Sequence, residues 1–218
     1  MPRATCPPSR HGRLGFANMV VMQVRRAHPA DAPVILETVT DAFHHDPTWS
    51  YVFSDPIARP AQYRRWWPLF IDGALRYDAS WVADEGAAVA IWIPPGGNEM
   101  SDEEEARIEP LLRELLGERA DLILPILDRF AAAHPYDEPH YYLTLLATRS
   151  DRRGKGLGMA LLRHCLAYVD VEHAPVYLES SNPANDARYE GAGFVRREGI
   201  TMPDGHLTVA TMWRPARQ

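Results

Sequence analysis

A short stretch of arginines and glycines has the residue types needed to hold a phosphate group. It reads RRGKGLG, Arg152 to Gly158, and lies between the apolar run HYYLTLLAT and the segment MALLRHCLAYV, whose leucines recur at helical spacing. Glycine lets the backbone approach a ligand closely, and the first N–H groups of a helix are unpaired and carry the positive end of its dipole. The order strand, glycine loop, helix therefore favours a pyrophosphate site. A tight strand-to-helix turn is the alternative interpretation of the loop alone.

The spacing of this loop excludes the two most familiar nucleotide-binding motifs. A P-loop requires Lys followed by Ser or Thr, whereas Gly156 follows Lys155. The dinucleotide fingerprint G-x-G-x-x-G/A requires Gly or Ala where this chain has Met159. The pattern that remains is R-x-x-G-x-G, beginning at Arg153.

A second segment, about 30 residues downstream, completes a family resemblance. It reads NPANDARYEGAGF and contains Asn182, Asn185, Tyr189 and the pair Gly193-Phe194. The two segments together resemble the GNAT family of N-acetyltransferases, which combine R/Q-x-x-G-x-G/A with a later N…Y-x-x-x-G-F. The resemblance covers roughly residues 22–213, and its wording is most similar to the puromycin N-acetyltransferase branch.

The resemblance implies both a fold and a co-substrate. The fold would be α/β, with a central mixed, mostly antiparallel sheet, helices on both faces and a splayed pair of central strands. Acetyl-CoA would bind with its pyrophosphate on the loop amides, its pantetheine along the preceding strand, and its arm near one of two asparagines between which the sequence does not choose. The implied cofactor-binding residues are Leu146, Ala147, Thr148, Arg152, Arg153, Gly154, Lys155, Gly156, Leu157, Gly158, Asn182 and Asn185.

The chemistry of acetyl transfer points to candidate catalytic residues. Transfer from a thioester to an amine needs a free amine, donors for the developing oxyanion and a proton for the leaving thiolate. Tyr189 stands where the family has its general acid, and a phenol can protonate a thiolate. Glu179 is the candidate general base, with Glu138, His140 and a chain of waters as alternatives.

Several polar and aromatic residues are candidates for the acceptor pocket, with ordinary packing or helix capping as the alternative for each. They are His44, His45, Asp46, Trp49, His140 and Tyr141, with Trp66 and Trp67 as further aromatic candidates. The HHD run has no second cluster with metal-ligand spacing, so no metal site is predicted. Cys165 lies on the apolar side of the helix after the glycine loop and is interpreted as a small buried hydrophobe rather than an acyl carrier.

The composition restricts the class of protein. The chain has 218 residues, of which 46% are hydrophobic, and a net charge of −6. An acidic protein lacks the basic field that a nucleic-acid binder needs, and no apolar run reaches the roughly 20 residues that span a bilayer. With two cysteines and no disulfide framework, we expect a cytoplasmic protein, monomeric or homodimeric, with neither nucleic-acid nor membrane partners.

The order of helix and strand signals predicts one GNAT-like domain over residues 22–218. Residues 1–21 are basic and rich in proline, so we expect a flexible N-terminal arm there. Between the strands, residues 101–134 predict a helical insertion opened by a capping box at Ser101. We expect breaks in that insertion near Pro110, Gly117 and Pro125, a single helix over residues 60–77, and hairpin turns at 84–86 and 203–205.

The sequence thus predicts an acetyl-CoA-dependent N-acetyltransferase acting on a primary amine of a small molecule, for example an antibiotic-like amine. Direct transfer is expected, because no activated cysteine is visible. Two alternatives remain open at this point. One is a non-catalytic acetyl-CoA-binding regulatory module, and the other is an acetyltransferase for amines of proteins.

Overall fold

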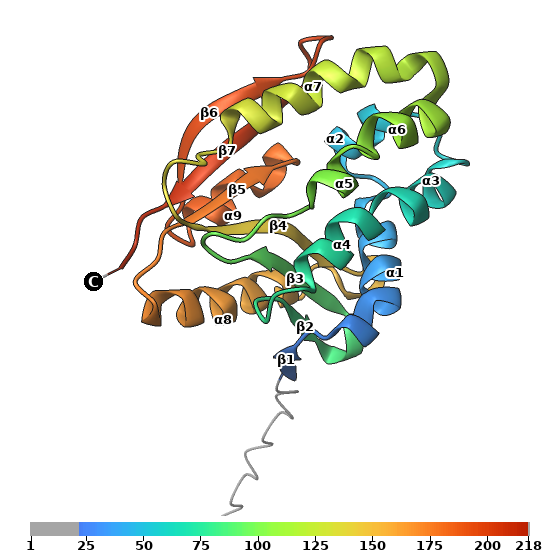
Figure 1. Cartoon of the computed structure of the whole chain (residues 1–218). Helices are drawn as coiled ribbons and strands as arrows, with labels where there is room; N and C mark the ends of the chain where they lie inside the picture. Colours follow the sequence, from blue (N-terminus) through green and yellow to red (C-terminus); the bar gives the residue numbers. More distant parts are fainter. Residues whose placement is uncertain (1–21, 218) are drawn as a thin grey trace, which may run out of the picture.

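The computed structural model describes residues 22–217. The N-terminal arm expected over residues 1–21 lies outside the described residues. Figure 1 shows a seven-stranded sheet in the order β1-β2-β3-β4-β5-β7-β6. Every neighbouring pair is antiparallel except β4 and β5, so the mixed, mostly antiparallel sheet that was predicted is confirmed. The strands are β1 (Val24–Arg26), β2 (Trp81–Ala83), β3 (Ala88–Ile93), β4 (Tyr141–Thr148), β5 (Val176–Ser180), β6 (Val195–Thr201) and β7 (Thr208–Arg214).

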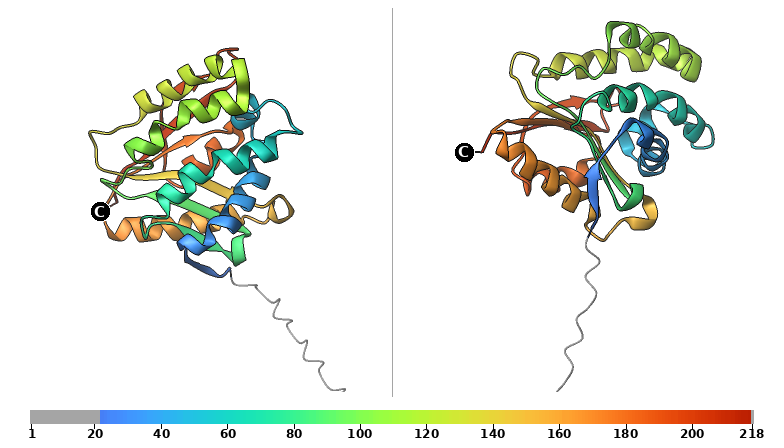
Figure 2. Two further views of the ribbon diagram at one scale, coloured as in Figure 1. Left: turned by 45° about the vertical axis from the view of Figure 1, so that its right-hand side comes forward. Right: turned by 60° about the horizontal axis from the view of Figure 1, so that its bottom comes forward.

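Helices cover both faces of this sheet, as Figure 2 shows. The long helix α8 packs on one face against β3 and β4, while α1 and α4 pack on the opposite face and α7 contacts β6. Each face has its own buried core, one beneath α8 and one beneath the other helices. The helices are α1 (Ala32–Phe43), α2 (Pro47–Val52), α3 (Arg59–Trp66), α4 (Pro68–Ala74), α5 (Asp102–Glu105), α6 (Ile108–Leu116), α7 (Ala120–Ala133), α8 (Leu157–Val171) and α9 (Asp186–Glu190).

The two central strands separate soon after they begin. β4 and β5 are paired in register only at Tyr141 with Val176 and at Tyr142 with Tyr177, although both strands continue beyond that point. In addition, β4 bulges against β3, and Thr144 is the extra residue on the bulged strand. A bulge bends a strand and changes the direction of its side chains. The predicted splay of the central pair is therefore present, and it opens the sheet in its middle.

The segments predicted to be helical are helical, but the helices are not always interrupted where expected. The helix expected over residues 60–77 is two helices, α3 and α4, which meet at Trp67. In the 101–134 stretch Gly117 does separate two helices, and the capping box at Ser101 is present. The break expected near Pro110 is present, because α5 ends at Glu105 and α6 begins at Ile108, but α7 continues through Pro125 without a break. Pro110 lies in the first turn of α6, where its missing N–H is not needed, and Pro125 lies inside α7 between two fully buried isoleucines that hold that helix on the core.

The helix that follows the glycine loop is amphipathic, as its leucine spacing predicted. Its buried side chains are Leu161, Leu162, Cys165, Leu166 and Val169. Burial raises the pKa of the Cys165 thiol to about 12, so this thiol stays protonated and inert. The interpretation of Cys165 as a core residue agrees with this environment.

Candidate active site

A cavity of about 1030 Å³ extends from the glycine loop, through the opening between β4 and β5, to the aromatic residues of α2, α3 and α7. It brings together most of the predicted site residues. Those that line it are His45, Asp46, Trp49, His140, Leu146, Thr148, Arg152, Arg153, Gly154, Gly156, Leu157, Gly158, Glu179, Asn182, Asn185 and Tyr189. His44, Tyr141, Ala147 and Lys155 do not line it.

The glycine loop has the backbone geometry of a phosphate cradle. Gly154 and Gly156 have φ angles of +76° and +75°, and a Cβ built on either would meet no atom of the protein within 4 Å. Gly156 is the residue that caps the N-terminus of α8. A Cβ on Gly158 would lie only 2.6 Å from the Thr148 hydroxyl, so the first turn of α8 packs closely on the end of β4. Exposed helix-start N–H groups beside side-chain-free backbone fit the pyrophosphate of CoA.

The end of α1 fixes the position of this loop. Both Oδ atoms of Asp41 accept hydrogen bonds from Ser150, one from its backbone N–H at 2.6 Å and one from its hydroxyl at 2.9 Å. The Arg153 guanidinium donates to the Ala42 carbonyl and, at 3.4 Å, to the Thr148 carbonyl. These contacts connect the first helix to a loop more than 100 residues later in the chain. The loop is therefore held by the fold before any ligand binds.

The end of β4 lies beside the loop with two of its three predicted cofactor-contacting residues toward the cavity. Leu146 and Thr148 line the cavity, whereas the Ala147 side chain is buried in the core on the helix-rich face. The separation of β4 from β5 leaves this part of β4 without a partner on one side. An edge of backbone N–H and C=O groups can pair with an extended amide-containing chain such as pantetheine.

Both candidate asparagines line the cavity, so the geometry does not choose between them. The Asn182 side chain caps the turn after β5 by accepting from the Ala184 N–H at 3.0 Å. Asn185 Oδ1 accepts from Arg188 at 2.5 Å. Arg188 itself lines the cavity and was missed in the sequence analysis, because a lone arginine in a short helix carries no motif.

Tyr189 lies in the same cavity and is supported from the C-terminal end of α9. Its carbonyl accepts from the N–H groups of Ala192 and Phe194, at 2.9 and 3.1 Å, and its ring packs against Phe194 with 6.0 Å between centroids. Burial, then the nearby carboxylates of Asp46 and Asp186, raise the pKa of Tyr189 well above its ordinary value of 10. Its hydroxyl therefore keeps its proton throughout the physiological pH range and can act as a donor.

Glu179 projects from β5 into the cavity, where two tyrosines flank it. The nearby hydroxyls of Tyr142 and Tyr177 lower its pKa, but burial has the larger effect and raises the pKa to about 7. A carboxyl group with a pKa near 7 can accept a proton at neutral pH and release it again. This geometry is compatible with the predicted role of Glu179 as a base.

A second carboxyl group, that of Glu99, lines the same cavity, near enough to Glu179 to be affected by its charge. It lies in the loop between β3 and α5 and accepts a hydrogen bond from the hydroxyl of Thr144, the bulge residue of β4. Burial, together with the charge on Glu179, raises the pKa of Glu99 to about 7. No motif marks Glu99, since it is one acidic residue among several in the segment IPPGGNEMSDEE.

Asp46 is both a cavity residue and a structural link. Its Oδ1 accepts from the Trp49 N–H at 3.1 Å and so caps α2, while its Oδ2 accepts from the Ser181 hydroxyl at 2.8 Å. The Thr48 hydroxyl donates to the Ser181 carbonyl in the same place. Burial raises the pKa of Asp46. These bonds connect α2 to the end of β5. They place Trp49 in the cavity wall, where its ring packs edge-to-face on Trp67 with 4.5 Å between centroids.

Four predicted site residues lie elsewhere or contribute only backbone. Tyr141 was expected at the acceptor pocket, but its side chain lies in the core beneath α8, and its hydroxyl donates to Glu172 at 2.6 Å. The reason is strand alternation: Tyr142, its neighbour, takes the cavity side. His44 packs edge-to-face on His45, with 4.6 Å between ring centroids, and does not line the cavity. The side chains of Ala147 and Lys155 are likewise outside it.

His140 belongs to an aromatic group at the rim of the cavity. It packs against His134, Tyr177 and Trp213, and its Nδ1 lies 2.5 Å from the Glu138 carbonyl. Burial lowers the pKa of His140 and lowers that of its neighbour His134 to about 4. Both imidazoles are therefore neutral at physiological pH.

Within residues 22–217, no group of three or more His, Cys, Asp or Glu side chains is arranged to hold a metal ion. None of the helices described over the same residues is long and apolar enough to cross a membrane.

Comparisons with known proteins agree with this fold. A family model described as the acetyltransferase (GNAT) family matches residues 126–194, the span from α7 through the glycine loop to Phe194. An acetyltransferase of Corynebacterium glutamicum, described as histone acetyltransferase HPA2 and related acetyltransferase, is 30% identical; the match covers 90% of this chain and 97% of that one, with a TM-score of 0.66. The chain belongs to the GNAT family of acetyltransferases.

Two further relatives extend the comparison. An uncharacterized N-acetyltransferase of Schizosaccharomyces pombe is 28% identical over 192 residues, which are 82% of this chain and 76% of the relative. Arylalkylamine N-acetyltransferase 2 of Aedes aegypti has a TM-score of 0.62 over 90% of this chain and 100% of its own, at 14% identity. At that identity the likeness concerns the fold alone.

Proposed function

We propose that this chain is an acetyl-CoA-dependent N-acetyltransferase that transfers an acetyl group directly to a primary amine of a small molecule. One observation carries the proposal: the glycine loop, Tyr189 and Glu179 line a single continuous cavity. A group that binds phosphate, a proton donor and a proton acceptor are what acetyl transfer to an amine requires.

The cofactor end of the cavity suits CoA. The N–H groups of Gly154 through Gly158 would hold the pyrophosphate, and Arg152, Arg153 and Arg188 would add positive charge. The free edge of β4 at Leu146 and Thr148 would hold the pantetheine, with Asn182 or Asn185 near the arm. When bound there, acetyl-CoA supplies the acetyl group and a thiol as leaving group.

The protein's own contribution to the reaction is to move two protons. Glu179 would accept one proton from the ammonium group of the acceptor: an N–H bond breaks and a carboxyl O–H bond forms, leaving a free amine as nucleophile. Tyr189 would donate its hydroxyl proton at the departing sulfur, and it would recover a proton from the nitrogen that has become an amide. The acceptor ammonium thus loses two protons, one to Glu179 and one that replaces the Tyr189 proton.

Direct transfer is favoured over a covalent acyl-enzyme. Cys165 is buried in the core beneath α8, its thiol pKa is raised to about 12, and it does not line the cavity. An acyl carrier would need a thiolate that reaches the thioester. The acetyl group would therefore pass straight from CoA to the amine.

A small molecule suits the acceptor half better than a protein amine. That half is walled by aromatic side chains, such as the buried Trp66 and the partly buried Trp49 and Phe70, and such a wall is typical of a ligand pocket rather than of a polar peptide groove. The proposal also includes a similarity to the puromycin N-acetyltransferase branch of the family. This similarity rests on the residues of the two sequence motifs. A non-catalytic acetyl-CoA-binding module would have no need of a raised-pKa carboxyl group opposite the cofactor loop.

The test is a panel of amines assayed by thiol release, combined with calorimetry of acetyl-CoA binding. The panel contains 2-phenylethylamine, hexylamine, 1,4-diaminobutane and a lysine-containing peptide. We expect acetyl-CoA to bind and at least one small amine to release CoA thiol in proportion to acetylated product. Binding of acetyl-CoA without turnover of any amine would favour the regulatory module, and turnover of the peptide alone would favour the protein-amine alternative.

A further inference from the structure

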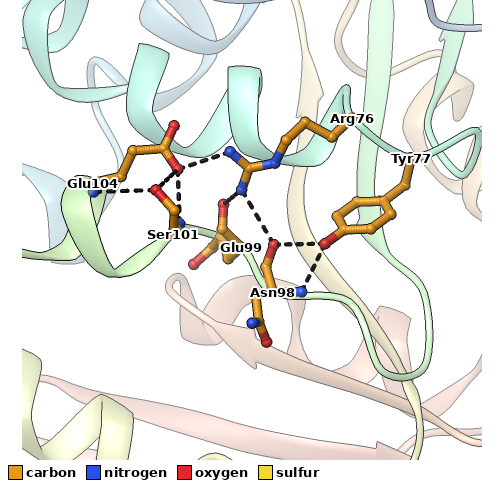
Figure 3. Close-up of polar contacts among 6 residues, drawn as sticks. All are labelled: Arg76, Tyr77, Asn98, Glu99, Ser101 and Glu104. Atoms are coloured by element: carbon orange, nitrogen blue, oxygen red, sulfur yellow. Dashed lines mark hydrogen bonds and ion pairs between the residues drawn. The ribbon is translucent and has the colours of Figure 1, made fainter.

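The loop that carries Glu99 is fixed on both sides of that residue, as Figure 3 shows. The Tyr77 hydroxyl accepts from the Asn98 N–H at 2.9 Å and donates to the Asn98 carbonyl at 3.2 Å. Arg76 donates to the Glu99 carbonyl at 3.2 Å and pairs with Glu104 at 2.8 Å. The Glu104 carboxylate in turn accepts a hydrogen bond from the backbone N–H of Ser101 at 2.8 Å. The position of Glu99 is therefore set by five neighbouring residues of the fold.

The helix beneath this loop confirms how closely it is packed. A Cβ on Gly73 of α4 would lie 1.8 Å from the Glu99 carbonyl oxygen, so only glycine fits there. Fixing a loop this firmly costs conformational entropy, and sites that must hold a side chain in a set direction are built in this way. The side chain that the loop directs into the cavity is the Glu99 carboxyl.

The surroundings of the Glu99 carboxyl leave its charge uncompensated. Its one side-chain hydrogen bond comes from Thr144, a neutral donor, and among residues 22–217 no basic side chain forms an ion pair with it. Arg76 binds the backbone of Glu99 rather than its carboxyl. The titratable groups that face this region are Glu179 of β5, Tyr142 of β4, Glu105 of α5 and Tyr136 of the loop before β4.

The two ends of the cavity also differ in charge. The arginines that line it are Arg152, Arg153 and Arg188, all at the cofactor end. The carboxylates that line it are Asp46, Glu99, Asp102, Glu105, Glu138 and Glu179. A cavity region whose charges have one sign attracts a ligand of the opposite sign and disfavours neutral or like-charged ligands. Together with the aromatic wall, this arrangement suits a cation attached to an apolar body.

We propose that Glu99 is the specificity-determining residue of the acceptor half, and that it binds the ammonium group of a primary amine carried on an apolar or aromatic body, near Glu179. This inference rests on the proposed function. Glu179 takes the proton, as described above, and Glu99 supplies the negative charge that selects the ammonium form and holds it in place. Because two neighbouring carboxyl groups do not both ionise readily, a bound cation also stabilises their charged forms.

The test compares the intact protein with Glu99→Gln, which keeps shape and removes charge. The probes are 2-phenylethylamine and its neutral analogue 2-phenylethanol, measured by calorimetry in the presence of CoA, which cannot transfer an acetyl group. We expect Glu99→Gln to weaken binding of the amine at least about tenfold, the scale of a lost hydrogen bond to a charged group, and to leave binding of the alcohol and of acetyl-CoA unchanged. In turnover, KM for the amine should rise by a similar factor while kcat changes less.

Two matched variants give the proposal further support or overturn it. Thr144→Val removes the hydroxyl that orients Glu99 and should raise KM for the amine in the same direction by a smaller factor. Tyr77→Phe loosens the loop without altering the carboxyl and should do likewise. Equal losses of amine and alcohol binding in Glu99→Gln would mean a structural role and overturn the proposal, as would unchanged amine binding.

Failure of this inference is distinguishable from failure of the proposed function. If the parent protein acetylates a small amine of the panel, the proposed function stands whatever Glu99→Gln does. A parent that acetylates only amines lacking an apolar body, or that fails to bind 2-phenylethylamine, overturns the substrate class inferred here. A parent that binds no acetyl-CoA overturns the proposed function itself.

Discussion

The cofactor end and the acceptor end of the cavity are built in different ways. At the cofactor end, the phosphate cradle comes from one contiguous stretch, the end of β4, the glycine loop and the start of α8, and its working groups are backbone N–H groups. At the acceptor end, side chains converge from α2, the β3–α5 loop, α7 and β5. Backbone cradles depend on the glycines that shape them, whereas the acceptor end depends on individual side chains. Substitutions should therefore separate the two ends cleanly.

The largest effect is expected where the two ends meet, at Tyr189. Tyr189→Phe removes one hydroxyl and keeps the ring packed on Phe194. If that hydroxyl protonates the leaving thiolate, kcat should fall on the order of 100-fold or more, because the interaction is made mainly in the transition state. Steady-state kinetics with an accepted amine measure kcat, and calorimetry should show acetyl-CoA affinity unchanged.

The matched control for this variant is Tyr141→Phe. It removes a hydroxyl from a tyrosine on the other face of the sheet, where the hydroxyl binds Glu172 rather than a ligand. It should lower the melting temperature slightly and leave turnover unchanged. Near-parental kcat in Tyr189→Phe, with chemistry rate-limiting, would mean that another group or solvent protonates the sulfur.

The cofactor end should respond next most strongly, to Gly156→Val. At a φ of +75° a β-branched residue is strained, and its side chain would project into the open space of the cradle. We expect acetyl-CoA affinity, measured by calorimetry, to fall about tenfold or more, since about 1.4 kcal/mol corresponds to one factor of ten. Binding of 2-phenylethylamine should be retained.

Gly205→Val separates strain from ligand contact. Gly205 has a φ of +74°, also with no atom within 4 Å of its Cβ position, but it lies in the turn between β6 and β7 and outside the cavity. This variant should lose a comparable amount of stability and keep its acetyl-CoA affinity. If both variants bind acetyl-CoA as the parent does, the glycine loop is only a turn.

The acceptor end can be tested through the pH dependence of Glu179→Gln. With the pKa of Glu179 raised to about 7, the carboxyl is protonated and unable to accept a proton below that pH. In the parent, kcat measured at saturating amine, where the bound cation keeps Glu99 ionised, should therefore rise with pH through about 7 and then level off. In Glu179→Gln this rise in kcat should disappear, and activity should recover only toward the pKa of the amine itself, where free amine is abundant. If the variant has the same pH profile as the parent, a group other than Glu179 is the base.

The cofactor end of the cavity could be predicted from the sequence far better than the acceptor end, for the same reason. Most helices and strands and the glycine loop could be predicted from local patterns, namely helix spacing, strand runs and R-x-x-G-x-G. The mixed sheet and its splayed central strands were predicted only through the resemblance to the GNAT family. Glu99, Tyr142 and Arg188 could not be, since each becomes a site residue only when distant elements meet. Tyr141 shows the physical reason most clearly: it and Tyr142 are adjacent and chemically alike, and only the register of β4 decides which of them faces the cavity. The roles assigned to Tyr189 and Glu179 remain predictions, although both side chains line the cavity.

The smallest effect is expected on stability, from the two neighbouring carboxyl groups of the cavity. Both Glu99 and Glu179 have pKa values raised to about 7 from an ordinary value of 4.5. Between those pH values the folded protein holds protons that the unfolded chain releases, so each group makes the fold less stable as pH rises from about 4.5 to about 7, and the penalty stays constant above that. Replacing either residue by Gln removes the penalty. The melting temperature of Glu99→Gln and of Glu179→Gln should therefore exceed that of the parent at pH 8, on the order of a few degrees, and the difference should shrink toward pH 5.

Glu114→Gln is the control, because Glu114 pairs with Arg65 on the surface and its pKa is lowered instead, so its loss should not stabilise the protein at pH 8. Melting curves at several pH values measure all three; if the glutamine variants at 99 and 179 are less stable than the parent at pH 8, these carboxylates serve the fold rather than the bound amine.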